Sequence, residues 1–188
     1  MAGPDAPVHA PIVSDWVDAE PVALAGGASV APCPGDALML CVTRDGADLG
    51  ILELATFEAP AELAAADRPS LDAALRSWAA EHLAWVEDDR RAGCGDDHAV
   101  VRTRPATVTL GGVPGVRTGF EVHLDGVLVE KVVTWVTVRE DTLVIVGADG
   151  ARTGSCMAGG DLVLWQPEAL VEHLDELDRV VAGTPLPG

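Results

Sequence analysis

The strongest constraint on the fold is one stretch of helical periodicity that lies between segments with strand-like alternation. From Ser70 to Arg91, apolar side chains recur at spacings of three and four residues, which places them on one helix face. Ser70 suits the N-cap position, and Gly93 and Gly95 end the pattern. We therefore expect one long amphipathic helix. Its predicted stripe consists of Leu71, Ala74, Leu75, Trp78, His82, Trp85 and Val86.

Strand-like segments stand on both sides of this helix. Before it, an Asp45-Gly46 turn separates two predicted strands, and after it Asp125-Gly126 is a two-residue hairpin signal. Pro105 cannot donate a ladder hydrogen bond, so it predicts an edge strand or a bulge. Short turns between successive strands favour an antiparallel sheet. The predicted strands are 37–43, 49–57, 99–110, 116–124, 127–138 and 142–147.

The remaining segments are predicted loops and a second helix. Residues 25–36 and 148–161 are rich in glycine or proline and are expected to be irregular. A helix is expected from Pro167 to Val181, with proline at its first position. Its predicted buried residues are Leu170, Leu174, Leu177 and Val181. The fold class that follows is α+β, with two main helices packed on an antiparallel sheet.

Charge and length limit the classes of function. The chain has 188 residues, 12 basic and 30 acidic, and a net charge of −18. Such a balance argues against nucleic acid and against an anionic membrane surface as partners. Apolar runs are too short for a membrane span, and no leader pattern is present, so a cytoplasmic location is expected. We expect one domain at 14–182, with a flexible arm at 1–13 and a tail at 183–188.

This layout resembles the small α+β family that includes PsbP, the actinobacterial lipoprotein LpqN and the bacterial DcrB-like proteins. The resemblance rests on Trp16 ahead of the first strand, the helix at Ser70–Arg91, and the hairpin at Asp125-Gly126. It also rests on a strand, Leu-Gly-Gly-x-Pro, strand pattern at 108–117. It implies a PsbP/LpqN-like sandwich and a non-enzymatic, adaptor-like or chaperone-like protein-binding role. The family brings no shared catalytic residue, so none is carried over.

The four cysteines offer a weaker hypothesis of metal binding or catalysis. Cys33, Cys41, Cys94 and Cys156 contain no C-x-x-C pair, and free thiols are expected in a reducing cytosol. Cys94 and His98 are close enough in sequence to supply two zinc ligands, which makes them the weaker metal candidates. The alternative function is accordingly a small hydrolase or metal-dependent enzyme using the Cys94/His98 region. The expectation that we favour has no metal and no cofactor.

Other polar groups match no known reactive pattern. Ser155 fails the G-x-S-x-G pattern, and Cys156 has no base assigned by sequence. The acids at 87–89 and 96–97 lack the spacing of a calcium loop and are interpreted as a solvated surface.

The candidate partner-binding residues are Trp78, Trp85 and His82 on the predicted helix. Two interpretations stay open: the rings are core residues that pack on the sheet, or they line a groove for a partner. The expected partner is a protein segment with basic and apolar residues, because the chain is strongly acidic. A further alternative is a structural subunit of a larger assembly.

Overall fold

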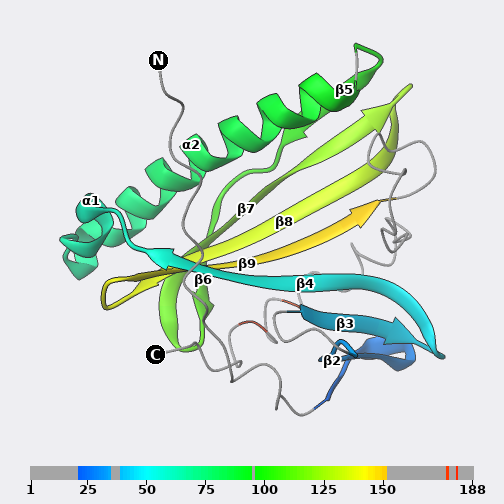
Figure 1. The fold of residues 1–188 in the computed structure, drawn as a ribbon, viewed down its shortest axis with the longest axis horizontal. Coiled ribbons are helices and arrows are strands. Elements are labelled where there is room, and N and C mark those ends of the chain that lie inside the picture. The colour runs from blue at the N-terminus through cyan, green and yellow to red at the C-terminus, as the bar shows by residue number, and fades with distance from the viewer. Residues whose placement is uncertain (1–20, 35–38, 95, 152–176, 178–180, 182–188) are drawn as a thin grey trace.

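The fold is an antiparallel sheet with a long helix across one face (Figure 1). The computed structural model describes residues 21–34, 39–94 and 96–151, together with Leu177 and Val181. The helical elements are η1 (Ala25–Gly27), α1 (Ala61–Ala64) and α2 (Arg68–Cys94). The strands are β1 (Val22–Ala23), β2 (Ala28–Pro32), β3 (Met39–Arg44), β4 (Ala47–Glu58), β5 (His98–Arg102), β6 (Ala106–Leu110), β7 (Val113–Leu124), β8 (Val127–Arg139) and β9 (Thr142–Ala151).

The strands form one sheet in the order β1-β2-β3-β4-β9-β8-β7-β5, and β6 also pairs with β7. All the described pairings are antiparallel, which confirms the predicted α+β class. The second predicted helix lies outside the described residues except for Leu177 and Val181, which are helical and buried. The sandwich packing of two main helices therefore stays a prediction, as do the arm, domain and tail boundaries.

Tight turns explain two of the hairpins. Asp45 and Gly46, between β3 and β4, have φ values of 53° and 78°. Asp125 and Gly126, between β7 and β8, have 51° and 78°. Two consecutive left-handed residues match the right-handed twist of the paired strands, and Asp-Gly tolerates this conformation well. Both predicted turns are confirmed.

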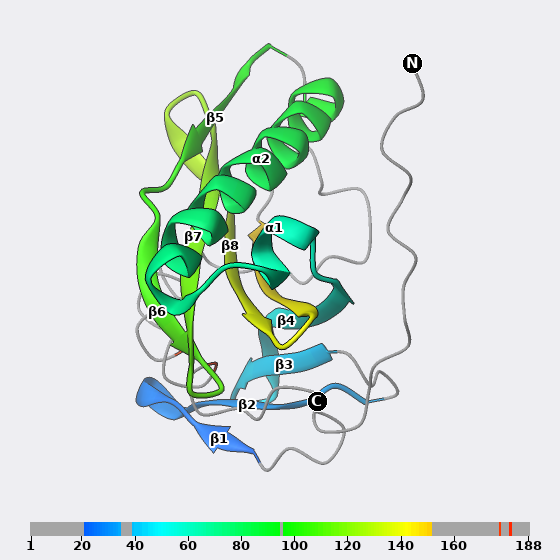
Figure 2. The same cartoon turned by 90° about the vertical axis from the view of Figure 1, so that its left-hand side faces the viewer.

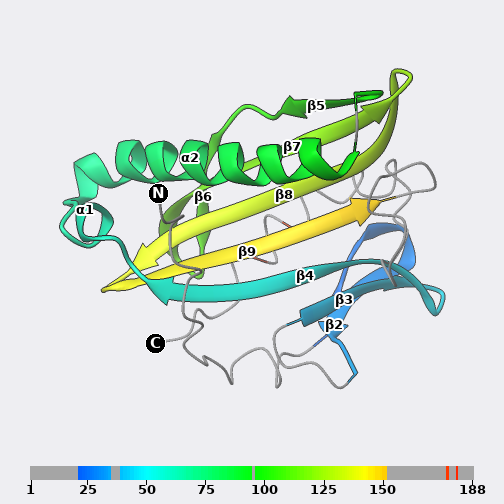
Figure 3. The ribbon, with the colours of Figure 1, turned by 45° about the horizontal axis from the view of Figure 1, so that its top comes forward.

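The helix α2 covers one face of the sheet, over β7 and parts of β5 and β8 (Figure 2). Leu75 and Ala79 pack with Val116 and Val136, and Leu83 packs in a second cluster further along the helix. Successive side chains of a strand point to opposite faces. Trp135, next to Val136, accordingly belongs to a third cluster with Leu177 and Val181. Figure 3 shows β9 and β4 to one side of α2.

The edge of the sheet is interrupted where Pro105 stands. β5 and β6 both pair with β7, at residues 120–124 and 113–117 respectively, and the chain between them leaves the ladder. The Thr103 backbone N–H still donates to the Gly119 carbonyl at 2.9 Å. The prediction of an edge strand or bulge at Pro105 is confirmed, because proline has no N–H to continue the pairing.

The helix begins earlier than expected, and its cap is a different residue. The Asp67 carboxylate accepts hydrogen bonds from the Ser70 backbone N–H at 3.1 Å and from the Ser70 hydroxyl at 2.5 Å. Asp67 therefore caps α2, and the assignment of Ser70 as N-cap is wrong. These hydrogen bonds favour the ionised carboxylate, so the pKa of Asp67 lies below its usual value.

Two predicted loops are partly strands. Residues 28–32 of the first segment form β2, whose Val30 is buried against the core. The second segment begins inside β9, which continues to Ala151 and pairs with β8 and β4. Their glycines and prolines suggested loops, but strand pairing outweighs local propensity at these positions. In the described part of the chain, no helix is long and apolar enough to cross a membrane.

The prediction of free thiols is wrong for the three described cysteines. Cys33 and Cys41 form a disulfide with a Cα–Cα distance of 5.0 Å. Cys41 pairs with Ala31 across β2 and β3, so the bond closes the connection between these strands. Cys94, at the end of α2, is also disulfide-bonded. The fourth cysteine, Cys156, lies outside the described residues.

Candidate functional site

Three rings follow one another along a side of α2, and we call Trp78, His82 and Trp85 the aromatic flank. The rings of Trp78 and His82 are stacked, with centroids 4.9 Å apart and an interplanar angle of 10°. The His82 ring lies 6.2 Å from that of Trp85 at a tilt of 32°. The helix places them together because residues four and three apart share a face.

Burial differs sharply within the aromatic flank. Trp78 is half-buried and packs against the cluster that contains Leu75 and Val136. Trp85 is 64% exposed, which is the highest exposure among the large exposed apolar side chains of the described residues. The core interpretation therefore holds for Trp78, whereas Trp85 is a surface residue.

His82 lies half-buried between these two environments. Burial lowers the pKa of its imidazole below the usual 6.5, because desolvation disfavours the charged ring. A neutral imidazole stacks on the Trp78 indole as a flat, weakly polar surface. The aromatic flank is thus continuous from the core to solvent near neutral pH.

Two carboxylates stand beside the exposed indole. Glu81 precedes Trp85 by four residues and Asp88 follows it by three, so both are its neighbours on the helix surface. Both side chains are exposed. Neither Glu81 nor Asp88 forms an ion pair with another described residue. Trp85 is therefore an exposed ring between two negative charges.

The opposite side of α2 is held to the sheet edge by hydrogen bonds. Arg76 donates to Asp72 at 2.7 Å, to the Thr107 hydroxyl at 2.7 Å and to the Pro105 carbonyl at 3.1 Å. Thr107 in turn donates to Asp72 at 2.8 Å. The hydrogen bonds from Arg76 and Thr107 hold the pKa of Asp72 below its usual value. This side of the helix is therefore bonded to the sheet edge.

Glu87 and Glu130 continue this attachment. Glu87 accepts from Arg91 at 2.7 Å and from Arg102 of β5 at 2.5 Å, and these bonds lower its pKa. The interpretation of this acid as a solvated surface group is therefore wrong. Glu130, fully buried on β8, accepts from Arg90 at 2.8 Å. Such pairs fix the position of α2 on the side away from the aromatic flank.

In the Cys94/His98 region, the weaker candidate for a metal or catalytic site, both named side chains already have partners. Cys94 is 8% exposed and disulfide-bonded, so its sulfur is not a thiolate that could bind zinc or attack a substrate. The His98 ring is 2.9 Å from the Asp97 carboxylate, its neighbour in sequence. No group of three metal-ligating side chains occurs in the part of the chain that the structure describes. Ser155 and Cys156 lie outside it.

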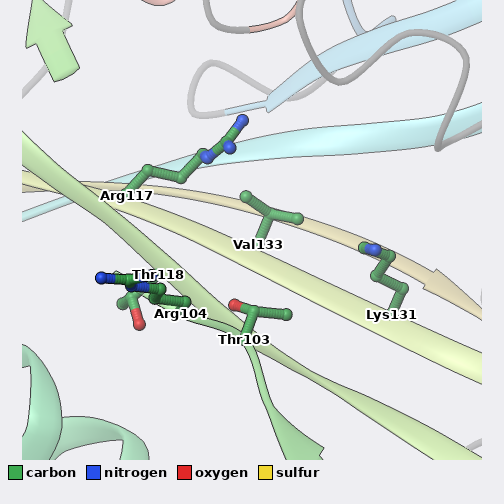
Figure 4. Close-up of a pocket in the computed structure, with 6 residues that line it drawn as sticks. All are labelled: Thr103, Arg104, Arg117, Thr118, Lys131 and Val133. Atoms are coloured by element: carbon green, nitrogen blue, oxygen red, sulfur yellow. The ribbon is translucent and has the colours of Figure 1, made fainter. Parts of the chain in front are cut away.

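The structure also reveals a small pocket of about 150 Å³ at the break between β5 and β6 (Figure 4). Sequence reasoning missed this pocket. Its residues are far apart in the chain, and only Pro105 signalled the interruption of the edge. The lining residues are Thr103, Arg104, Arg117, Thr118, Lys131 and Val133.

Comparisons with known proteins concern the fold. No family model matches the sequence, and no curated protein matches it. Among solved structures, the chain is similar to the solution structure of cyanobacterial PsbP (CyanoP) from Synechocystis sp. PCC 6803. The TM-score is 0.48 at 12% sequence identity, over 85% of this chain and 81% of that one. The resemblance noted in the sequence is to the family of this same protein.

Proposed function

We propose that the protein is a non-enzymatic protein-binding module, adaptor-like or chaperone-like, that presents the aromatic flank of α2 to a segment of a partner protein. The observation that carries the proposal is the 64% exposure of Trp85 on a helix whose other side is bonded to the sheet. Tryptophan is enriched among the residues that dominate binding energies, since it contributes a large, rigid apolar surface.

Charge specifies the chemistry of the partner. The chain carries a net charge of −18, and Glu81 and Asp88 stand on either side of Trp85. A basic side chain that stacks on the indole would gain a cation–π contact and an ion pair together. Attraction between exposed charges is weak in salt, so the indole supplies the apolar contact that affinity requires. The partner segment therefore carries arginine or lysine next to apolar residues.

The test compares Trp85→Ala with a matched surface variant, Val101→Ala. Val101, on β5, is 52% exposed, so both substitutions remove exposed apolar surface. Each tagged variant is used to capture proteins from the source lysate, and captured proteins are quantified against the wild type. We expect one protein to be lost with Trp85→Ala and retained with Val101→Ala. Equal recovery with both variants would exclude the aromatic flank as the contact.

The alternatives have less support. An enzyme that uses Cys94 as nucleophile or ligand needs a thiolate, and this sulfur is disulfide-bonded. A structural subunit of a larger assembly stays a prediction, which the native mass of the protein in lysate tests. The cytoplasmic location also stays a prediction. The oxidised Cys33, Cys41 and Cys94 favour an oxidising compartment instead, because structural disulfides are rare in reducing cytosol.

A further inference from the structure

Basic residues gather in the pocket at the edge break, although the chain as a whole is strongly acidic. Three of the 12 basic residues line it: Arg104, Arg117 and Lys131, which is the chain's one lysine. Figure 4 shows Val133 between Arg117 and Lys131, with Thr103, Arg104 and Thr118 grouped across from them. Composition does not explain this grouping, because acids outnumber bases 30 to 12.

The pocket lies over the pairing of β7 with β8, next to the edge break. Gly119 of β7 pairs with Val133 of β8, and the two backbones come so near that a Cβ at position 119 would overlap the Val132 carbonyl oxygen. The neighbouring pairs on the same face are Arg117 with Trp135 and Glu121 with Lys131. Thr103 and Arg104 complete the lining because the chain leaves the edge ladder there. A basic rim around a small apolar floor is the result.

Lys131 and Arg104 keep hydrogen-bond donors that no described carboxylate uses. Lys131 donates to Glu121 at 2.5 Å, and an ammonium group has two further hydrogens. Burial raises the pKa of Glu121, but hydrogen bonds and charge from Lys131 and His123 outweigh burial and lower it. Arg104 makes no ion pair with any described residue.

We propose that this pocket binds a small oxyanion, a carboxylate or phosphate group, through Arg104, Arg117 and Lys131, with Val133 against the apolar part of the ligand. Guanidinium groups suit such anions because their paired N–H donors match two oxygens. A volume of about 150 Å³ admits an anionic group with a short alkyl chain. The site is separate from the aromatic flank and does not depend on the proposed function.

The experiment titrates the full-length protein with sodium butyrate and, separately, with inorganic phosphate at constant ionic strength. Backbone amide resonances of Thr103 and Val133 report on the pocket. Arg104→Gln and Arg117→Gln remove one charge each from the pocket. Arg91→Gln removes the same charge from an exposed position on α2, and is the matched control.

We expect saturable shifts with at least one anion, weakened about tenfold by either pocket substitution and less than about twofold by Arg91→Gln. Binding of butyrate alone identifies a carboxylate ligand, and binding of phosphate alone a phosphate ligand. Absence of saturation with both anions would overturn the proposal, as would equal weakening by Arg91→Gln. If Arg117→Gln fails to fold, the anion titration of Arg104→Gln is the test, because Arg104 is exposed and its substitution should not affect folding.

Discussion

Trp78 and Trp85 are the same residue type on one helix, yet they have different neighbours. Trp78 packs against the core below α2, and Trp85 lies in solvent between Glu81 and Asp88. Hydrophobic stabilisation scales with the apolar area removed from water. The two indoles should therefore contribute to different properties, one to folding and the other to binding.

Alanine substitution should separate these roles. We expect Trp78→Ala to lower the free energy of unfolding by about 1–3 kcal/mol, because it leaves a partly enclosed space beside the core. Trp85→Ala should change it by less than about 0.5 kcal/mol, as for other exposed sites. Urea denaturation followed by circular dichroism measures both. Equal destabilisation by the two variants would mean that Trp85 is a core residue.

His82 should make stability depend on pH. Its pKa is lowered by burial in the folded protein, whereas the unfolded chain titrates near 6.5. The unfolded state therefore takes up the proton first, and stability falls as the pH drops below about 6.5 toward the lowered native pKa. Above that range His82 has no effect. Unfolding free energies at pH 7.5 and 5.5 should differ less in His82→Gln than in the wild type; an unchanged difference would assign the pH dependence to other groups.

At the scale of elements, α2 is attached to the sheet along one side by charged hydrogen bonds. Arg90 and Glu130 form the most buried of these pairs, with side chains 13% and 0% exposed. Removing one partner of a buried ion pair leaves an uncompensated charge, which costs more than the pair contributes. The orientation of the aromatic flank should depend on this pair.

Glu130→Ala should accordingly destabilise the protein by about 3–5 kcal/mol. Replacing both residues by apolar ones of similar size, Arg90→Met with Glu130→Leu, should recover most of this loss, since no charge remains buried. Thermal and urea unfolding of the three proteins tests the account. If Glu130→Ala were as stable as the wild type, the Arg90–Glu130 ion pair would contribute little to the free energy of unfolding.

The strand pair β7–β8 should tolerate no side chain at position 119. A Cβ at Gly119 would overlap the Val132 carbonyl oxygen, so Gly119→Ala should cost about 1–3 kcal/mol. Gly147 of β9 has no atom within 4 Å of the corresponding position, and Gly147→Ala should be neutral or stabilising. Similar unfolding midpoints for the two variants would contradict the close approach at Gly119.

In the molecule as a whole, the helix α2 and the tight turns could be predicted from neighbouring residues in the sequence. The disulfide and the pocket could not, because they depend on contacts between residues far apart in the chain. The Asp-Gly turns and the period of α2 depend on neighbouring residues and could be predicted. Asp67 was missed because Ser70 also suits a cap. The Cys33–Cys41 bond depends on the register of β2 and β3, which the sequence does not state. The pocket needs Arg104, Arg117 and Lys131 from three segments that only the folded sheet brings together.

The described cysteines are all oxidised, and this can be measured on the whole protein. Alkylation of the unreduced, denatured protein should leave Cys33, Cys41 and Cys94 unmodified, and prior reduction should make all three reactive. Peptide mass spectrometry measures the modification. If Cys94 were a free thiol in protein isolated from its native source, the alternative of a reactive site at Cys94 and His98 would be supported.

Cross-linking from position 85 shows whether Trp85 contacts a partner protein, as we propose. The photoreactive residue p-benzoylphenylalanine replaces Trp85 in one variant and Val101, which is also exposed, in another, and both are irradiated in cells of the source organism. We predict one discrete cross-linked protein from position 85 that is absent from position 101, with arginine or lysine in the cross-linked segment. No adduct from position 85, or the same adducts from both positions, would contradict the account.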